Sequence, residues 1–381
     1  MIENSLTPPN RTIAQKLWQI PWFFVFLLCV VSGVGVAMLY SAANGNMEPW
    51  ALQHMVRFAV SLLLMLIIAM IDVRVWMRYS YALYFFTLML LGLVEFFGSI
   101  GMGAQRWISL GYFSLQPSEL MKVTMVLALA RYFHSGSLED YSRIQFLVLP
   151  LMLVIAPVLL VLRQPDLGTA IMLILASGAI FFVVGVKIWK FLVVIIGGFS
   201  VMPILWQFLH SYQKQRVLTF LNPERDPLGS GYHIIQSKIA LGSGGLSGKG
   251  FLEGTQGHLR FLPEMQTDFI FTMLAEEFGL LGGVGLVFLY ALLILYGVVL
   301  SLGSRSQFGR LVGAGVTATF FLYVFINIAM VMGLIPIVGA PLPLISYGGT
   351  AMLTVLVGFG FLLSVWNHRD IIISQRGGNE Y

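Results

Sequence analysis

The sequence has very little cysteine and very little charge. Its single cysteine, Cys29, lies inside an apolar run, which excludes both a disulfide framework and a cysteine-based metal cluster. Only 10% of the 381 residues are charged and 58% are hydrophobic, and the mean hydropathy is +0.86. This balance excludes a soluble globular protein. The six histidines are scattered without ligand spacing, so a histidine metal site is not expected.

Internal repeats and low-complexity tracts are also absent, which excludes solenoid and linker architectures. The glycine-rich stretch 242–250 resembles a nucleotide-binding P-loop only superficially. Ser243 stands where that motif requires its first glycine, and Gly250 stands where it requires Ser or Thr. Nucleotide binding is therefore excluded. The basic residues fall mostly in short loops between apolar runs, a pattern that sets membrane topology and does not indicate nucleic acid as a partner.

Long apolar runs dominate what is present. A helix needs roughly 20 apolar residues to cross ~30 Å of hydrocarbon. Ten runs qualify approximately: 21–41, 53–72, 80–100, 119–134, 145–162, 168–186, 188–210, 268–300, 311–333 and 349–366. The first run has no small-residue cleavage site and is expected to be retained. We predict one all-α domain over residues 1–381, a polytopic membrane helical bundle of about ten transmembrane helices. One large extracytoplasmic loop, about 211–267, lies within it.

The basic residues predict the orientation of these spans. With the N-terminus in the cytoplasm, the inner loops and tails hold Arg11, Lys16, Arg74, Arg78, Arg131, Arg143, Lys187, Lys190, Arg305, Arg310, Arg369 and Arg376. The short outer loops hold only Arg106 and Arg163, as expected when positive residues stay inside. We therefore predict a multi-pass inner-membrane protein with cytoplasmic termini and an extracytoplasmic active site.

Charges at membrane edges are the first candidates for function, because they are costly to keep there. Under this topology the outer ends of the spans carry Glu95, Arg106, Glu119, Lys122, Arg163, Asp166, Glu264, Asp268, Glu276 and Glu277. Few comparable charges occupy the cytoplasmic halves, which argues against an ion pathway. Glu276 and Glu277 lie roughly 12 to 14 Å below Asp268 along a helix, too far to act with it on one bond. We expect them to be structural and to pair with Lys122 or Arg106.

Two short motifs carry both a structural and a functional interpretation. Glu119 and Lys122 share a helix face just after Pro117, where they form a local ion pair or let Lys122 meet a phosphate. Asp166 is placed to cap the following helix. Beside it, Arg163 has the planar fork of donors that suits a diphosphate.

Asp268 ranks first among the candidates. It lies where water gives way to apolar surroundings, the setting in which a carboxylate becomes a usable general base, although a helix cap is the alternative. Upstream of it, the 242–250 stretch is either a flexible turn or an anion cradle of backbone N–H groups beside Lys249. Downstream, Ser346 and Tyr347 end a Pro/Gly-rich segment of the kind that lines cavities at membrane depth, where they would contact a polar head group.

Six strings in the sequence resemble the motifs of one known family. They are Gly103-Ala104-Gln105-Arg106-Trp107-Ile108, Gln116-Pro117-Ser118-Glu119, Gln164-Pro165-Asp166-Leu167-Gly168-Thr169, Asp226-Pro227-Leu228-Gly229-Ser230-Gly231-Tyr232, Thr267-Asp268-Phe269-Ile270-Phe271 and Pro343-Leu344-Ile345-Ser346-Tyr347-Gly348-Gly349. On these strings the chain resembles the SEDS family of shape, elongation, division and sporulation proteins. Asn222-Pro223-Glu224, Gly254-Thr255-Gln256 and Ile337-Val338-Gly339-Ala340-Pro341 make it more similar to the RodA-type elongation branch than to the FtsW-type division branch.

The resemblance implies a peptidoglycan glycosyltransferase that polymerises lipid II into β-1,4 glycan strands, with a class B penicillin-binding protein as partner. It identifies Asp268 with the family's essential aspartate. We expect Asp268 to be the general base that takes the proton of the acceptor's C4 hydroxyl, whose oxygen then attacks the donor and expels undecaprenyl diphosphate. The family commonly has histidine where this chain has Gln266, which puts a histidine proton relay in doubt. The residues expected to bind substrate are Arg106, Gln116, Ser118, Glu119, Lys122, Arg163, Asp166, Arg216, Lys238, Lys249, Glu264, Thr267, Ser346 and Tyr347.

The leaving diphosphate is expected to be neutralised by these basic residues or by a divalent cation, Mg²⁺ or Mn²⁺. No organic cofactor is expected. Two other functions stay open on the sequence alone. A lipid II flippase would need charges through the full depth of a cavity, and a non-enzymatic scaffold of the wall-synthesis complex would not need Asp268.

Overall fold

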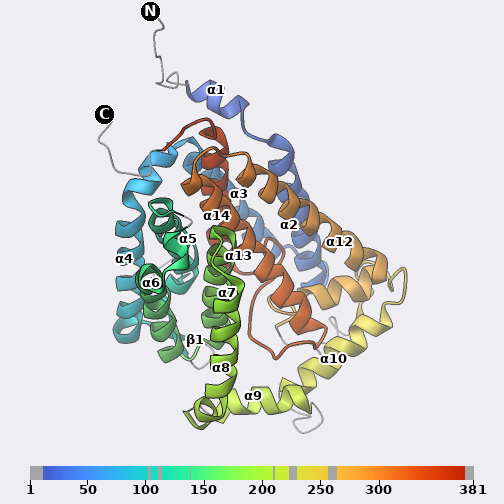
Figure 1. Ribbon diagram of the computed structural model, residues 1–381. Helices are drawn as coiled ribbons and strands as arrows, with labels where there is room; N and C mark the ends of the chain where they lie inside the picture. Colours follow the sequence, from blue (N-terminus) through green and yellow to red (C-terminus); the bar gives the residue numbers. More distant parts are fainter. Residues whose placement is uncertain are drawn as a thin grey trace, which may run out of the picture.

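The computed structural model describes residues 12–101, 104–109, 114–137, 139–208, 211–222, 230–255 and 264–373. They form a bundle of long helices, shown in Figure 1, in which both termini lie at one end. Helices α9 (Ser211–Leu221) and α10 (Ser230–Ser243) lie at the opposite end. Helix α10 packs against α12 (Ile270–Leu302), which begins just after Asp268, so we call this the candidate-site end and the other the terminal end.

Each of the ten predicted runs forms a helix. In chain order these are α2 (Trp22–Ala42), α3 (Ala51–Met70), α4 (Val73–Phe97), α5 (Pro117–His134), α6 (Ile144–Arg163), α7 (Leu167–Val184), α8 (Ile188–Phe208), α12 (Ile270–Leu302), α13 (Gln307–Val331) and α14 (Gly349–Asn367). Within the described residues, eight of them are long and apolar enough to cross a membrane, and the other two are α5 and α8. The prediction of an all-α polytopic bundle is confirmed.

The start of α5 and the continuity of α6 follow from their prolines. Pro117 is the first helical residue of α5, where its missing N–H costs nothing. Pro150 and Pro157 lie inside α6, which nevertheless runs unbroken. Prolines are tolerated in spanning helices because neighbouring groups satisfy the freed carbonyls.

The shorter elements lie in the connections. Before α2 there is α1 (Ile13–Trp18), and between α5 and α6 there is a 3-10 turn, η1 (Asp140–Ser142). Between α4 and α5 the chain forms a small antiparallel sheet of β1 (Ser99–Gly101), β2 (Ala104–Ser109) and β3 (Ser114–Leu115) in that spatial order. This sheet was not predicted, because its strands are too short to show a clear alternation.

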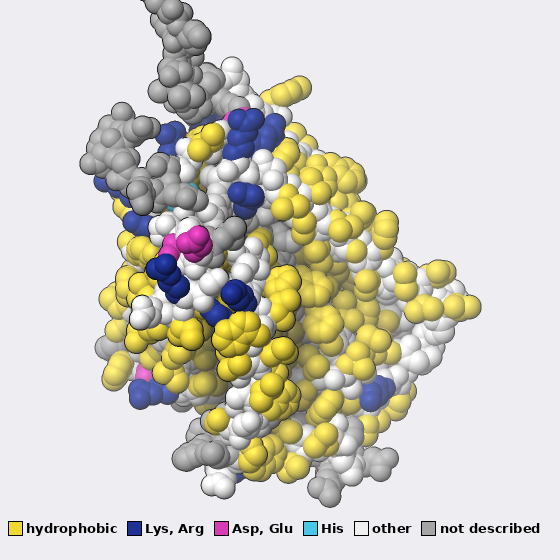
Figure 2. Space-filling view, in the orientation of Figure 1, with side chains coloured by type: hydrophobic (Ala, Val, Ile, Leu, Met, Phe, Trp, Pro, Cys, Tyr) yellow, Lys and Arg dark blue, Asp and Glu magenta, His cyan; other side chains and the backbone are white. Residues whose placement is uncertain are grey.

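Helices α13 and α14 form the centre of the bundle. In their apolar windows 67% and 78% of the residues are buried, compared with 28% in α3 and in α4. The peripheral helices turn their apolar side chains outward. Figure 2 shows a broad belt of hydrophobic side chains on one face, and most of the visible Lys and Arg side chains gather toward the end that carries the termini. An apolar exterior of this kind suits contact with lipid.

Helix α12 is broken at Gly279, whose φ of 66° and ψ of −161° are not helical. The glycine-rich turn 242–250 folds onto this break and supplies the hydrogen bonds that it loses. Leu280 N donates to Gly245 O over 2.9 Å, and Gly250 N donates to the Glu277 carbonyl over 3.0 Å. The stretch interpreted from sequence as a flexible turn or anion cradle is therefore a close-packed cap on the kink.

The fit between turn and kink leaves no room for a side chain at Gly248. This glycine has a φ of +81°, and a Cβ there would lie 2.1 Å from the Glu277 carbonyl oxygen. Gly248→Ala is expected to cost at least ~2 kcal/mol of stability, from overpacking and a left-handed backbone together. Thermal unfolding of the purified protein measures it.

The matched control is Gly242→Ala, in the same stretch, where a Cβ would meet nothing within 4 Å. This variant should melt at or slightly above the wild-type temperature, because Gly242 lies in α10 and alanine is the better helix former. Equal melting temperatures for the two variants would show that the turn does not clamp α12.

Candidate active site

The first-ranked candidate, Asp268, lies on a short segment, 264–269, that leads into α12. A hydrogen bond from Asn327 fixes its backbone. Asn327 of α13 donates from Nδ2 to the Asp268 carbonyl over 2.9 Å and to the Ala340 carbonyl over 2.6 Å. One side chain thus ties the segment that carries Asp268 to the Pro/Gly-rich segment 333–348.

Ser346 and Tyr347 strengthen the same junction. The Ser346 hydroxyl donates to the Thr267 carbonyl over 2.5 Å and accepts from Leu342 N over 2.7 Å. The Tyr347 backbone N–H donates to the Gln266 carbonyl over 2.8 Å. These two predicted head-group contacts therefore hold the Asp268 segment in place through its backbone.

The Asp268 side chain is half-buried. A Cβ built on Gly339 would lie 3.6 Å from Asp268 Oδ2, so the carboxylate lies against the backbone of the 333–348 segment. Phe269 occupies the N-cap position of α12, which makes the helix-cap interpretation of Asp268 wrong. The backbone that carries the carboxylate is therefore fixed, and the side chain lies half-exposed beside the 333–348 segment.

Arg106 and Asp166 form a second group, at the start of α7. Asp166 caps α7 as predicted, because its carboxylate accepts from Thr169 N over 3.1 Å and from the Thr169 hydroxyl over 2.9 Å. Arg106 Nη1 lies 3.6 Å from Asp166 Oδ2, and the same guanidinium donates to the Gln164 and Pro165 carbonyls. The arginine thus fixes the turn between α6 and α7.

Glu119 and Lys122 form a third group, deep in the bundle. Lys122 Nζ lies 2.6 Å from Glu119 Oε1 and donates to the Tyr323 hydroxyl over 2.6 Å, while that hydroxyl donates to Glu119 Oε2. The exposed fractions are 4% for Glu119 and 1% for Lys122. The local ion pair expected from the sequence is confirmed, and Tyr323 closes it into a buried triad.

Helix α13 connects the triad to the Asp268 segment. Tyr323 and Asn327 stand four residues apart, so they share a face of the helix and are separated by ~6 Å along its axis. The sequence analysis missed both residues. The available signal was two polar side chains at helical spacing inside an apolar span, where polar groups mark functional or packing contacts.

Glu276 and Glu277 pair differently from the prediction. Glu276 Oε1 lies 2.6 Å from Lys249 Nζ and also accepts from the Thr255 hydroxyl, and Glu277 accepts from the Ser41 hydroxyl. The predicted pairing with Lys122 or Arg106 is wrong, because the ion pairs of those two residues go to Glu119 and Asp166. The glycine-rich turn instead places Lys249 beside Glu276.

The other predicted substrate-binding residues are spread over several elements. Arg163 is exposed at the end of α6, and Lys238 is exposed on α10, where it lies over Gly333. Glu264 is exposed and Ser118 is buried. Gln116 precedes α5 and is half-buried, and Arg216 lies on α9. The motif at 226–232 begins outside the described residues.

Comparison with known proteins identifies the family. The family model for FtsW, RodA and SpoVE, described as cell cycle proteins, matches residues 16–371. The chain belongs to the FtsW/RodA/SpoVE family. This confirms the SEDS resemblance of the sequence motifs. Together with its long apolar helices, it makes this FtsW/RodA/SpoVE protein a multi-pass protein of the inner membrane.

The similarity to known relatives extends over nearly all of the chain. It is 42% identical over 373 residues to the Escherichia coli K12 peptidoglycan glycosyltransferase MrdB, covering 96% of this chain and 98% of that protein. It is 34% identical to the stage V sporulation protein E of Bacillus subtilis, covering 90% and 95%.

Solved structures show the same arrangement of helices. A chain from a study of how a peptidoglycan synthase complex coordinates polymerization and crosslinking has a TM-score of 0.79 and 34% identity, covering 92% of this chain and 98% of that chain. The rod shape determining protein RodA of Thermus thermophilus has a TM-score of 0.70 and 29% identity, covering 92% and 98%. The fold of this family member is therefore that of the RodA structures.

Proposed function

We propose that this protein is a peptidoglycan glycosyltransferase that polymerises lipid II during cell elongation. The observation that carries the proposal is the near-full-length similarity to a protein named for that activity, at 42% identity. The fixed backbone of the Asp268 segment supports it, because a general base must be positioned in order to act. The termini are cytoplasmic in this proposal, and the candidate-site end faces the outside.

In the proposed reaction Asp268 takes the proton from the C4 hydroxyl of the acceptor sugar. That oxygen forms a bond to the anomeric carbon of the donor, the bond from this carbon to the diphosphate breaks, and undecaprenyl diphosphate leaves with the bonding electrons. The α-linked donor gives a β-1,4 bond by inversion. Exposed basic residues, Arg163 and Lys238 among them, are proposed to stabilise the negative charge of the leaving diphosphate.

A divalent cation fits the site only together with the substrate. Among the described residues no group of three His, Cys, Asp or Glu side chains could hold an ion. Mg²⁺ commonly uses one or two carboxylates plus substrate phosphates, and the exposed carboxylate of Glu264, four residues before Asp268, would provide one here. Such an ion would neutralise the diphosphate.

The partner in this proposal is a class B penicillin-binding protein. The support is the similarity to a chain of a peptidoglycan synthase complex that coordinates polymerization with crosslinking. In such a pair, the strand made by one protein is the substrate for crosslinking by the other.

The experiment that tests the proposal uses labelled lipid II with the purified full-length chain and a class B partner. Glycan strands that a muramidase degrades are the expected product. Lipid II that crosses proteoliposome membranes without being polymerised would favour the flippase instead. Failure of both, with normal partner binding, would favour the scaffold.

A further inference from the structure

A second site candidate lies at the end of the bundle opposite Asp268. A pocket of about 530 Å³ opens between the end of α7, the last turns of α12 and the first half of α13. This volume lies within the roughly 300–1,000 Å³ typical of ligand sites. The lining does not include any member of the three groups around Asp268, Asp166 and Lys122, so the proposed polymerisation leaves it without a role.

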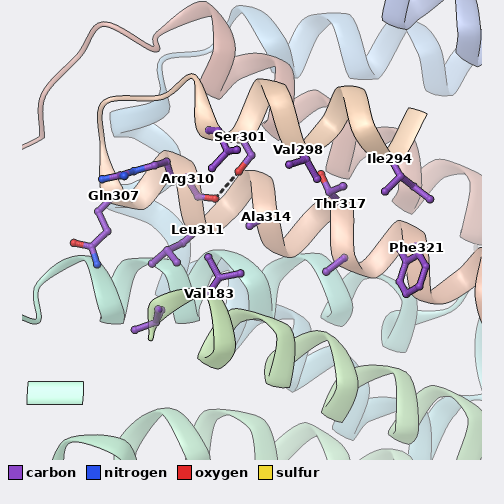
Figure 3. A pocket seen from close by; sticks show the side chains of 13 residues that line it. Val183, Ile294, Val298, Ser301, Gln307, Arg310, Leu311, Ala314, Thr317 and Phe321 are labelled. Carbon is purple, nitrogen blue, oxygen red and sulfur yellow. Dashed lines mark hydrogen bonds between the residues drawn. The ribbon is translucent and has the colours of Figure 1, made fainter. Parts of the chain in front are cut away.

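One end of the pocket is polar and the rest is apolar. Figure 3 shows Arg310 and Gln307 at one end and Ile294 and Phe321 at the other, with Val183 on the opposite wall. From Arg310 to Phe321 the helix rises ~16 Å, close to half of the ~30 Å hydrocarbon thickness. The pocket therefore runs from one membrane surface to the middle of the bilayer. It lies in the leaflet on the same side of the membrane as the termini.

The hollow is part of the packing of the helices. Gly297 and Thr317 bring α12 and α13 together so closely that a Cβ on Gly297 would lie 2.7 Å from Thr317 Oγ1. Between these contacts and α7, the pocket wall on α13 is formed by Ala314 and Ala318, whose side chains are too small to fill it. The space is therefore kept open by the fixed positions of its walls.

The mouth of the pocket is positively charged. Arg310 is exposed and, among the residues that the structure describes, forms no ion pair. Gln307 of the lining donates to the Tyr141 hydroxyl over 2.8 Å. Lys190 donates to the carbonyl of Ser142, the residue after Tyr141, over 2.9 Å. A second cation thus lies beside the mouth.

Asp140, the acidic residue beside Tyr141 in the chain, forms no ion pair with either cation within the described part of the chain. Asp140 accepts from the backbone N–H and the hydroxyl of Ser137, and these hydrogen bonds lower the pKa of its carboxyl. An arginine at the surface above an apolar pocket matches a phosphate head group joined to an acyl chain.

We propose that this pocket binds an anionic phospholipid of the cytoplasmic leaflet, with its phosphate at Arg310 and one acyl chain along Val298, Ala314 and Phe321. The lipid would fill the space enclosed by α7, α12 and α13. It would also tie the protein to membrane regions rich in anionic lipid. The site is separate from the proposed polymerisation site.

The test measures lipid retained by the purified full-length protein in native mass spectrometry. The probes are phosphatidylglycerol and phosphatidylethanolamine with identical acyl chains. The wild type is expected to retain phosphatidylglycerol in preference. Arg310→Gln should weaken that retention roughly tenfold, the usual effect of losing a hydrogen bond to a charged group.

Arg305→Gln is the matched control, because it removes the same charge from the α12–α13 turn at a residue outside the pocket. Ala314→Phe fills the pocket and keeps every charge, so it should also lower retention. Equal loss in the Arg305 and Arg310 variants, equal retention of the two lipids, or unchanged binding by Ala314→Phe would each overturn the proposal. Displacement of phosphatidylglycerol by a neutral polyprenyl alcohol would assign the pocket to a different lipid and overturn it as well.

Discussion

Replacing Asp268 with asparagine is expected to lower glycan polymerisation by about 10²- to 10⁴-fold, the usual contribution of a positioned general base. Asparagine has nearly the same shape but cannot take a proton from the acceptor hydroxyl at neutral pH. The anchors of this segment would remain. Asn327 binds the main-chain carbonyl of residue 268, and Ser346 binds the carbonyl of Thr267. The variant should therefore fold, reach the membrane and bind its partner.

Turnover and substrate affinity must be measured separately, because they distinguish a base from a binding residue. Loss of a base lowers kcat, whereas loss of a binding contact that acts equally on substrate and transition state raises KM. Glu253→Gln is the matched control, since Glu253 is an exposed carboxylate in the same outer region and should leave both constants unchanged. An Asp268→Asn enzyme with near-normal kcat would remove this carboxylate from the mechanism.

The sequence was sufficient for the helices because their signal is local. The length and composition of each apolar run are enough to predict a helix, and each of the ten predicted runs forms one. The cap at Asp166 and the pair of Glu119 with Lys122 were predictable for the same reason, since their partners stand three residues away. Contacts within one turn are fixed by helix geometry.

The partners that lie far along the chain could not be predicted in this way. Tyr323 completes the triad from 201 residues beyond Lys122. Lys249 reaches Glu276 from the glycine-rich turn that packs on the break of α12 at Gly279. A glycine inside a long apolar run does not reveal whether the helix continues through it. The partner of Glu276 was therefore predicted wrongly, because the prediction assumed a straight helix and considered only the depth of Glu276 along it.

Replacing Lys122 with methionine is expected to cost about 3–5 kcal/mol of stability, the usual penalty for removing one partner of a buried ion pair. The Glu119 carboxylate would stay buried without its cation, and its remaining neighbour in the triad, the Tyr323 hydroxyl, carries no charge. Thermal unfolding in one fixed detergent should show a large fall in melting temperature.

The double variant Glu119→Gln with Lys122→Met separates stability from function. It removes both charges together and keeps an amide oxygen that accepts from Tyr323, so most of the lost stability should return. If this stable protein polymerises lipid II at the wild-type rate, the triad serves only to hold α5 against α13. If it is stable but inactive, Lys122 acts on the substrate or positions Asp268 through the face of α13 that carries Tyr323 and Asn327. A double variant as unstable as Lys122→Met alone would contradict the ion-pair explanation of the penalty.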